Sequence, residues 1–181
     1  GGFFEKEAYD TAQEIRTRIK NELGLTVSIG VSYNKIFAKL GSDLKKPDAV
    51  TVLSPSDYET KIAPLPVSDL LYAGPKTTAK LALAGIHTVK DAASVPVQSM
   101  VRLLGKNGYA LWIFANGLDR TPVQRSDSVS PVKSVGHGVT CISDLKTTDE
   151  IKRAVIELSQ DVAHRLYAYG MRARCVTVNI R

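Results

Sequence analysis

Four lysines in the segment 25–47 have the type and spacing needed to bind a phosphate-bearing ligand. Lys35 and Lys39 are one helical turn apart in a stretch whose apolar residues recur at helical spacing, so their side chains face a common surface. Lys45 and Lys46 follow at the predicted end of this helix. Ammonium groups bind phosphate as point charges. A solvated helix end whose lysines complement the helix dipole is the alternative, and spacing alone leaves both interpretations open.

A second group suited to phosphate lies in the segment 70–94, around a tight turn at Ala73 and Gly74. Pro75 suits the first position of a following helix, and Lys76 comes next, where backbone N–H groups are free and point outward. A turn containing glycine lets such groups approach a DNA phosphate closely. The pattern is typical of a helix-hairpin-helix, with an ordinary pair of antiparallel helices as the alternative.

The lysine segment needs a strand and a helix to position it. Residues 25–32 alternate apolar and polar side chains, which predicts a strand with one buried face, and Asn34 suits the N-cap of the helix that follows. Residues 50–53 are predicted to form a short strand and residues 54–62 a helix. An amphipathic helix over 3–22 is expected to pack on the first strand. Its apolar stripe consists of Phe4, Ala8, Ala12, Ile15 and Ile19.

The rest of the chain divides by composition. Prolines near residue 64 indicate a domain boundary, and helices are predicted from there to residue 118, with the aromatic side chains of 109–114 as core rather than as a base-stacking surface. Residues 119–133 show no period and predict a linker. Alternating segments at 134–141 and 175–181 flank a long amphipathic helix over 148–169, which predicts a β-α-β unit.

Composition and charge narrow the class of protein. Hydrophobic residues make up 44% and charged residues 23%, as in ordinary globular chains. No apolar run approaches the ~18 residues of a membrane span, and the N-terminus lacks a signal-peptide pattern, so we expect a cytoplasmic protein. Cys141 and Cys175 lack the spacing of a metal site or a disulfide framework and are expected to be free thiols.

Positive charge is concentrated in the middle of the chain. The net charge is +6, and Lys and Arg outnumber Asp and Glu by 8 to 3 in residues 61–125, compared with 8 to 9 in 1–60 and 8 to 6 in 126–181. Localised positive charge favours a polyanionic partner such as DNA. A modest basic excess also occurs in proteins that bind no nucleic acid.

The segment SIGVSYNKIFAKLGSDLKKP resembles the last palm segment of the Y-family translesion DNA polymerases, the DinB/UmuC-like group. The shared pattern is S-x-G-x-S-x-N-K-x-x-A-K-x-x-S-x-x-x-K-P. The resemblance implies that Lys46 reaches the triphosphate of the incoming nucleotide and that Lys39 is a second basic residue near the same site. It also implies primer-template DNA and a deoxynucleoside triphosphate as partners of the parent protein.

Y-family thumbs contain a hairpin commonly written G-x-G-x-K-T, and Tyr72 stands where its first glycine would be. A residue other than glycine is costly at positive φ, so either the turn differs here or this position does not need that conformation. Gly74, Lys76 and Thr77 are the DNA-binding candidates in the thumb.

The segments SVGHGVTC and ARCVTVNIR resemble the first half of the Y-family little finger, a DNA-binding domain with a β-α-β-β-α-β plan. Lys133, Ser134 and Arg174 are the DNA-binding candidates there. His137 is expected to be solvated or to contact a phosphate, because a histidine without a carboxylate partner is a poor catalytic residue. We expect 134–181 to be poorly ordered or to be completed by other segments, including those of another copy, because exposed strand edges recruit partners.

These observations predict an α+β fold that covers part of a polymerase. The predicted parts are the end of the palm (3–63), an all-α helix-hairpin-helix thumb (64–118), a linker (119–133) and half of a little finger (134–181). The alternative is a non-catalytic helix-hairpin-helix DNA-binding or scaffold module, which would have no use for a nucleotide-phosphate ligand at Lys46.

The resemblance places the metal-binding carboxylates of the family before the first helix. None of Asp10, Asp43 or Asp48 has their sequence context, so we expect neither a catalytic residue nor a metal ligand in this sequence. Mg²⁺ is expected in the parent enzyme, held by residues outside the sequence, and the fragment alone is expected to be inactive. The segment that binds the sliding clamp, usual in the family's C-terminal tail, is also not found.

Overall fold

The computed structural model describes residues 2–128 and 131–180 and divides into two units, 1–123 and 124–181, which are treated separately. Some predictions lie outside the described part. They concern the Phe4 side chain, linker residues 129–130 and Arg181.

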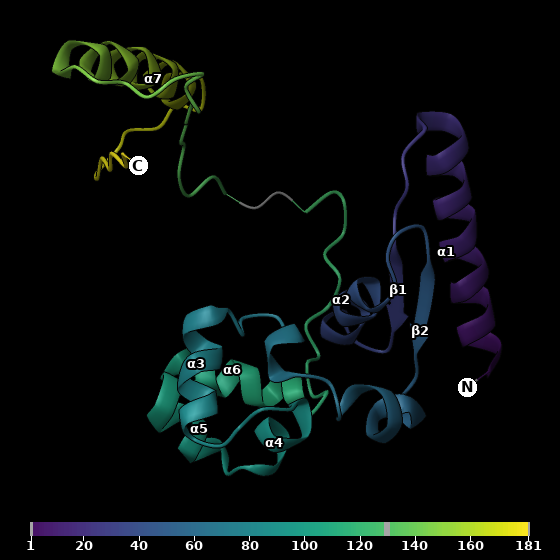
Figure 1. The fold of residues 1–181 in the computed structure, drawn as a ribbon. Helices are drawn as coiled ribbons and strands as arrows, with labels where there is room; N and C mark the ends of the chain where they lie inside the picture. The colour runs from purple at the N-terminus through teal and green to yellow at the C-terminus, as the bar shows by residue number, and fades with distance from the viewer. Residues whose placement is uncertain (1, 129–130, 181) are drawn as a thin grey trace. The chain divides into compact units, whose positions relative to one another are not determined.

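The first unit begins with helix α1 (Gly2–Leu23), strand β1 (Ile29–Ser32), helix α2 (Lys35–Leu44) and strand β2 (Val50–Leu53), and the two strands pair in parallel. Figure 1 shows α1 and α2 on opposite sides of this sheet. A Cβ at position 30 would collide with the backbone of α2, so glycine at this position permits the close packing of helix on strand.

Local sequence determines where α2 starts but does not determine the length of β1. The Asn34 side chain accepts a hydrogen bond of 2.8 Å from the Phe37 backbone N–H and caps α2 as predicted. The predicted strand over 25–32 is too long, because β2 offers hydrogen-bonding partners to four residues only, from Ile29 to Ser32. Leu25 is left exposed.

The stripe predicted on α1 is only partly buried. Ala12 packs inside and Ile19 is half-buried, whereas Ala8 and Ile15 are exposed. The two-stranded sheet is too narrow to cover the whole stripe. The helix predicted over 54–62 instead forms a 3₁₀ turn at Pro55–Asp57 and a π turn at Tyr58–Ile62, which begin at a Ser54–Asp57 capping box.

The remainder of the first unit is helical. Its elements are a 3₁₀ turn at Val67–Asp69, α3 (Pro75–Leu83), α4 (Val89–Ser94), α5 (Val97–Leu104) and α6 (Lys106–Ala115). One buried cluster runs from Phe37 and Leu40 of α2 to Met100 of α5 and Leu111 of α6. The core therefore continues across residue 64, where a boundary between palm and thumb is predicted.

Two hydrogen bonds fix α6 against its neighbours in the first unit. The Tyr58 hydroxyl donates to the Ala115 carbonyl at 2.8 Å, and the Trp112 indole N–H donates to the Val95 carbonyl at 2.9 Å. Trp112 and Phe114 pack against the core as predicted for the aromatic segment, whereas Tyr109 is exposed.

The described residues of the second unit form one helix, α7 (Thr148–Ala168), which begins with a capping box between Thr147 and Glu150. The strands predicted at 134–141 and 175–181 are not formed among the described residues of these segments. No described residue of the second unit is buried. A strand needs a hydrogen-bonding partner, and alternation of side chains supplies none. A closely packed second unit would contradict the expectation that 134–181 is poorly ordered or completed by other segments. The described residues of this unit do not form such a packed domain.

Candidate functional site

Lys39 and Lys46 lie at one hollow of about 370 Å³ on the first unit. Lys39 comes from α2, and Lys46 from the turn between α2 and β2. Both ammonium groups pair with the Asp43 carboxylate, and the Lys46 Nζ to Asp43 Oδ1 distance is 2.8 Å. Hydrogen bonds from Lys39 and then Lys46 lower the pKa of Asp43. The structure thus brings the two predicted phosphate-binding lysines together around one carboxylate.

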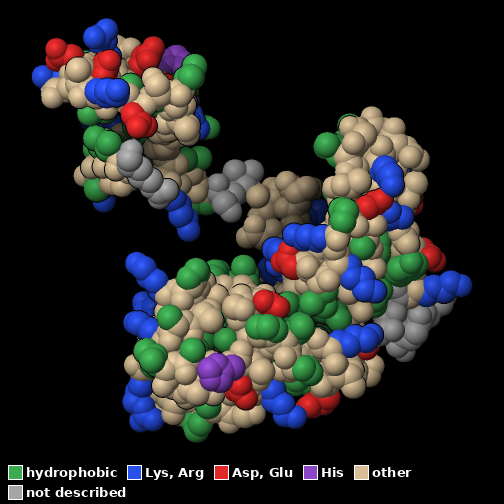
Figure 2. Space-filling view, viewed as in Figure 1, with side chains coloured by type: hydrophobic (Ala, Val, Ile, Leu, Met, Phe, Trp, Pro, Cys, Tyr) green, Lys and Arg blue, Asp and Glu red, His purple; other side chains and the backbone are tan. Residues whose placement is uncertain are grey.

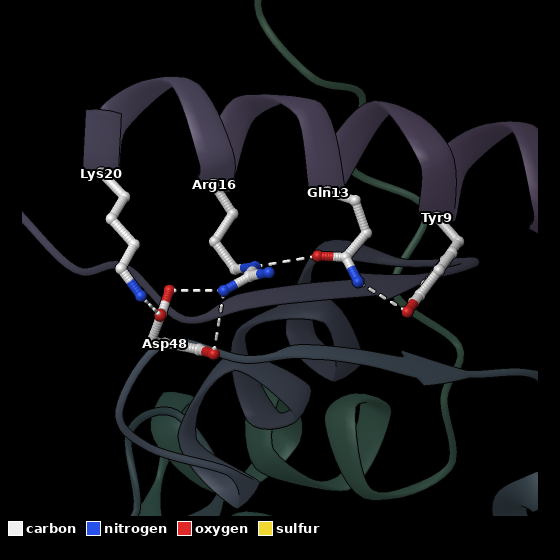
Figure 3. A network of polar contacts seen from close by, with 5 residues as sticks. All are labelled: Tyr9, Gln13, Arg16, Lys20 and Asp48. Atoms are coloured by element: carbon white, nitrogen blue, oxygen red, sulfur yellow. Dashed lines mark hydrogen bonds and ion pairs between the residues drawn. The ribbon is translucent and has the colours of Figure 1, made fainter. Parts of the chain in front are cut away.

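Asp48 connects the turn that carries Lys46 to α1 (Figure 3). Its Oδ1 accepts a hydrogen bond of 2.6 Å from Arg16, and its Oδ2 one of 2.6 Å from Lys20. Arg16 also donates to the Asp48 carbonyl at 3.3 Å. Hydrogen bonds from Lys20, and then from Arg16, lower the pKa of Asp48. Asp48 also lines the hollow at Lys39 and Lys46.

The turn before α3 presents its backbone to solvent. Gly74 is exposed with φ −66°, and a Cβ added there would meet nothing within 4 Å. Glycine is therefore not needed for the backbone conformation, and its contribution is an unobstructed surface. Lys76 is exposed and Thr77 half-buried, whereas the Thr78 hydroxyl donates to the Ala73 carbonyl at 3.0 Å. The three thumb candidates share one turn.

Tyr72 adopts the left-handed conformation, with φ +73°, at the position where the family pattern has glycine. The turn therefore keeps the shape that glycine favours, at a cost of about 1 kcal/mol or more in backbone energy. Its ring packs on Phe114 with centroids 5.6 Å apart. This packing offsets part of the strain and explains how a bulky residue is held there.

The second-unit candidates Lys133, Ser134 and Arg174 are exposed, and no hydrogen bond or ion pair links them within the described residues. The expectation that His137 lacks a carboxylate partner is wrong. Its Nδ1 lies 2.9 Å from Asp161 Oδ2, because α7 brings Asp161 opposite the 136–137 segment.

The part of the chain that the structure describes contains no group of three or more His, Cys, Asp or Glu residues placed to hold a metal ion. No step of metal-dependent chemistry is therefore assigned to these residues. Among the described helices, none combines the length and apolar character that a membrane crossing requires.

Comparison with known proteins decides the family. The model of the impB/mucB/samB family matches residues 4–43, and that of its C-terminal domain matches residues 132–181. DNA polymerase IV of Acetivibrio thermocellus is 48% identical over 170 residues, which cover 94% of this chain. DNA polymerase IV of Moorella thermoacetica is 36% identical over 170 residues. This chain belongs to the Y-family DNA polymerases.

Parts of two solved structures have a fold similar to that of this chain. A Y-family DNA polymerase chimera matches 88% of the chain with a TM-score of 0.73 at 22% identity. The crystal structure of DinB from Sulfolobus solfataricus matches 66% with a TM-score of 0.60 at 25% identity. The chain spans 43% of the Acetivibrio relative and 46% of the chimera, so it corresponds to less than half of each.

The sequence pattern does not reveal every charged residue around Lys39 and Lys46. Asp43 was detectable, because it follows Lys39 by one helical turn and faces the same surface. Arg16 and Lys20 lie outside the apolar stripe of α1, and their shared contact with Asp48 has no local signature in the sequence.

Proposed function

We propose that this chain is the part of an error-prone translesion DNA polymerase that grips the backbone of primer-template DNA and the phosphates of the incoming nucleotide. The activity of the whole protein would be template-directed nucleotidyl transfer past DNA damage. The names of the relatives, DNA polymerase IV, support this activity. The observation that carries the DNA-binding part is the open turn before α3.

The α3 turn suits a backbone phosphate for three reasons. Pro75 at the first helical position has no N–H, and the next N–H groups, of Lys76 and Thr77, have no carbonyl within the helix to bond. The absence of a side chain on Gly74 allows a phosphate oxygen to approach them. Basic side chains gather on the outer side of the helices around α3 and α5, which adds sequence-independent attraction (Figure 2).

The hollow at Lys39 and Lys46 suits the triphosphate of a nucleotide. Two ammonium groups already lie around one carboxylate, and phosphate oxygens make the same charge-assisted contacts. We further propose Lys133, Ser134 and Arg174 as backbone contacts of the second unit.

Fluorescence anisotropy of the chain with a labelled primer-template duplex, across a salt series, tests the DNA grip. We expect binding that weakens steeply with salt, and a further loss of about three- to tenfold in Lys76→Ala. The matched control is Lys6→Ala, which removes the same charge from an exposed position on α1.

Three outcomes would contradict this part of the proposal. They are absence of salt-dependent binding, an unchanged affinity in Lys76→Ala, and an equal loss in Lys6→Ala. The last would mean that net charge alone governs binding.

The proposal also includes a metal, a protein partner and a cellular location for the whole polymerase. We propose Mg²⁺ as its metal and a sliding clamp as a partner, both bound by residues that this sequence does not contain. The cytoplasmic location expected from the sequence belongs to the same proposal.

A further inference from the structure

The turn that carries Lys46 is held from two sides. On the α2 side, Asp43 pairs with Lys46 itself. On the α1 side, Asp48 adopts φ +56° and accepts hydrogen bonds from two cations of α1. The Ile29 N–H bonds to the Ala49 carbonyl at 2.8 Å, which ties the end of the turn to β1. Lys46 therefore depends on α1 for its position, although α1 is distant in sequence.

The Arg16 side chain is also held in place by neighbouring residues of α1. Its Nε donates to Gln13 Oε1 at 2.8 Å, and Gln13 Nε2 donates to the Tyr9 hydroxyl at 2.6 Å, so these side chains form a row along one face of α1 (Figure 3). The Arg16 and Asp48 side chains are 23% and 18% exposed, whereas Lys20 is 54% exposed. The Arg16 pair is the less solvated contact and is the better suited to fix the turn.

The same contact decides the sign of the charge at the hollow. The charged side chains that line it are two lysines, Lys39 and Lys46, and two carboxylates, Asp43 and Asp48, so their charges cancel. Lining charges that sum to zero give an approaching phosphate little long-range attraction, because the contributions of the lysines and the carboxylates oppose each other. Arg16 and Lys20 bind Asp48 and make the cations of the group outnumber its carboxylates. Helix α1 therefore supplies the excess positive charge beside the two lysines that line the hollow.

We propose that Arg16 and Lys20 are positioning residues for the nucleotide-phosphate site. They fix the turn that carries Lys46 through Asp48, and they give the hollow its net positive charge. This inference rests on the proposed role of Lys46 in binding phosphate.

Calorimetric titration of the chain with inorganic tripolyphosphate tests the proposal. We expect Lys46→Ala to lose binding, and Arg16→Ala and Lys20→Ala each to weaken it about three- to tenfold. Arg16→Lys should restore part of the affinity, because it keeps the charge but loses the forked geometry. Arg18→Ala is the matched control, because Arg18 lies on the same helix, is 65% exposed and pairs with Glu22 away from the hollow.

Folding is checked by circular dichroism at the titration temperature. Lys20→Ala keeps the test decisive if Arg16→Ala unfolds, because Lys20 is the more exposed partner. If Lys46→Ala loses binding but Arg16→Ala and Lys20→Ala bind like the parent chain, the positioning role is refuted and the proposed role of Lys46 stands. An equal loss in Arg18→Ala also refutes it. If the parent chain does not bind, or Lys46→Ala binds equally well, the role of Lys46 fails and the inference fails with it.

Discussion

Helices α6 and α7 belong to different units, and both are rich in apolar residues, yet only α6 packs in a core of buried residues. In α6, Leu111 is 1% exposed and Ala115 is fully buried, against a core shared with α2 and α5. In α7, no described residue is buried, although its apolar residues form a regular stripe. Most helical stability in proteins comes from burying such a stripe. The apolar residues of α6 therefore contribute much to the stability of the first unit, whereas those of α7 contribute little to that of the second.

The largest test of this difference is one substitution made in both helices. Leu111→Ala is expected to lower the free energy of unfolding by about 2–5 kcal/mol, because it leaves a cavity in the core. Leu158→Ala on α7 should cost less than about 1 kcal/mol, because Leu158 is only half-buried. Urea unfolding followed by the fluorescence of Trp112, the one tryptophan of the chain, measures the first unit, and far-UV circular dichroism follows the second. Equal losses of unfolding free energy in Leu111→Ala and Leu158→Ala would contradict the difference in packing between α6 and α7.

Two glycines that end α6 and α7 allow a second comparison. Gly117 and Gly170 have φ of +66° and +64°, but a Cβ at position 117 would lie 2.6 Å from the Tyr33 hydroxyl, whereas one at 170 meets nothing within 4 Å. We expect Gly117→Ala to cost about 2–4 kcal/mol, from conformation and crowding together. Gly170→Ala should cost about 1–2 kcal/mol, from conformation alone. Thermal unfolding of each variant measures this, and a greater loss in Gly170→Ala would contradict it.

The helix caps give a smaller contrast. Asn34 caps α2 and also donates to the Gly117 carbonyl at 3.3 Å, whereas Thr147 caps α7 through local contacts only. Asn34→Ala should therefore cost about 1–2 kcal/mol and Thr147→Ala about 0.5–1 kcal/mol. Asn34→Ser keeps the cap but removes the contact with Gly117, so it should fall between the parent and Asn34→Ala. Urea midpoints rank the variants, and an Asn34→Ser midpoint equal to that of Asn34→Ala would show that the cap itself contributes nothing.

The smallest expected effect is a pH dependence. Hydrogen bonds from Lys61, and then from Ser54, lower the pKa of Asp57 from 3.8 to about 2. Its contribution to stability is complete above pH 3.8 and is lost as the pH falls toward about 2. Asp57→Asn should flatten the dependence of the Trp112 unfolding midpoint on pH in this window. Contacts with Thr147 and Lys146 lower the pKa of Glu150 in the second unit, so its contribution to α7 is lost on acidification. Glu150→Gln should therefore reduce the loss of α7 helicity on acidification and leave the first unit unchanged. A change in the Trp112 midpoint of Glu150→Gln would link the two units.

The sequence by itself determined the features that depend on neighbouring residues. These are the Asn34 cap of α2, the Thr88–Asp91 capping box of α4 and the helical face shared by Lys39 and Asp43. Each involves atoms within about one helical turn, so residue type and spacing suffice. The family resemblance was likewise carried by continuous segments, above all SIGVSYNKIFAKLGSDLKKP.

Only the tertiary structure decided which segments pair and which charges meet. Residues 25–28 alternate as a strand does but gain no partner, because β2 is short, and the segments 134–141 and 175–180 alternate without forming strands in the described chain. Arg16 looked like an ordinary surface charge of α1 until the fold placed Asp48 beside it. Hydrogen bonds and ion pairs act over a few ångströms in space, whereas sequence patterns report only on neighbours along the chain.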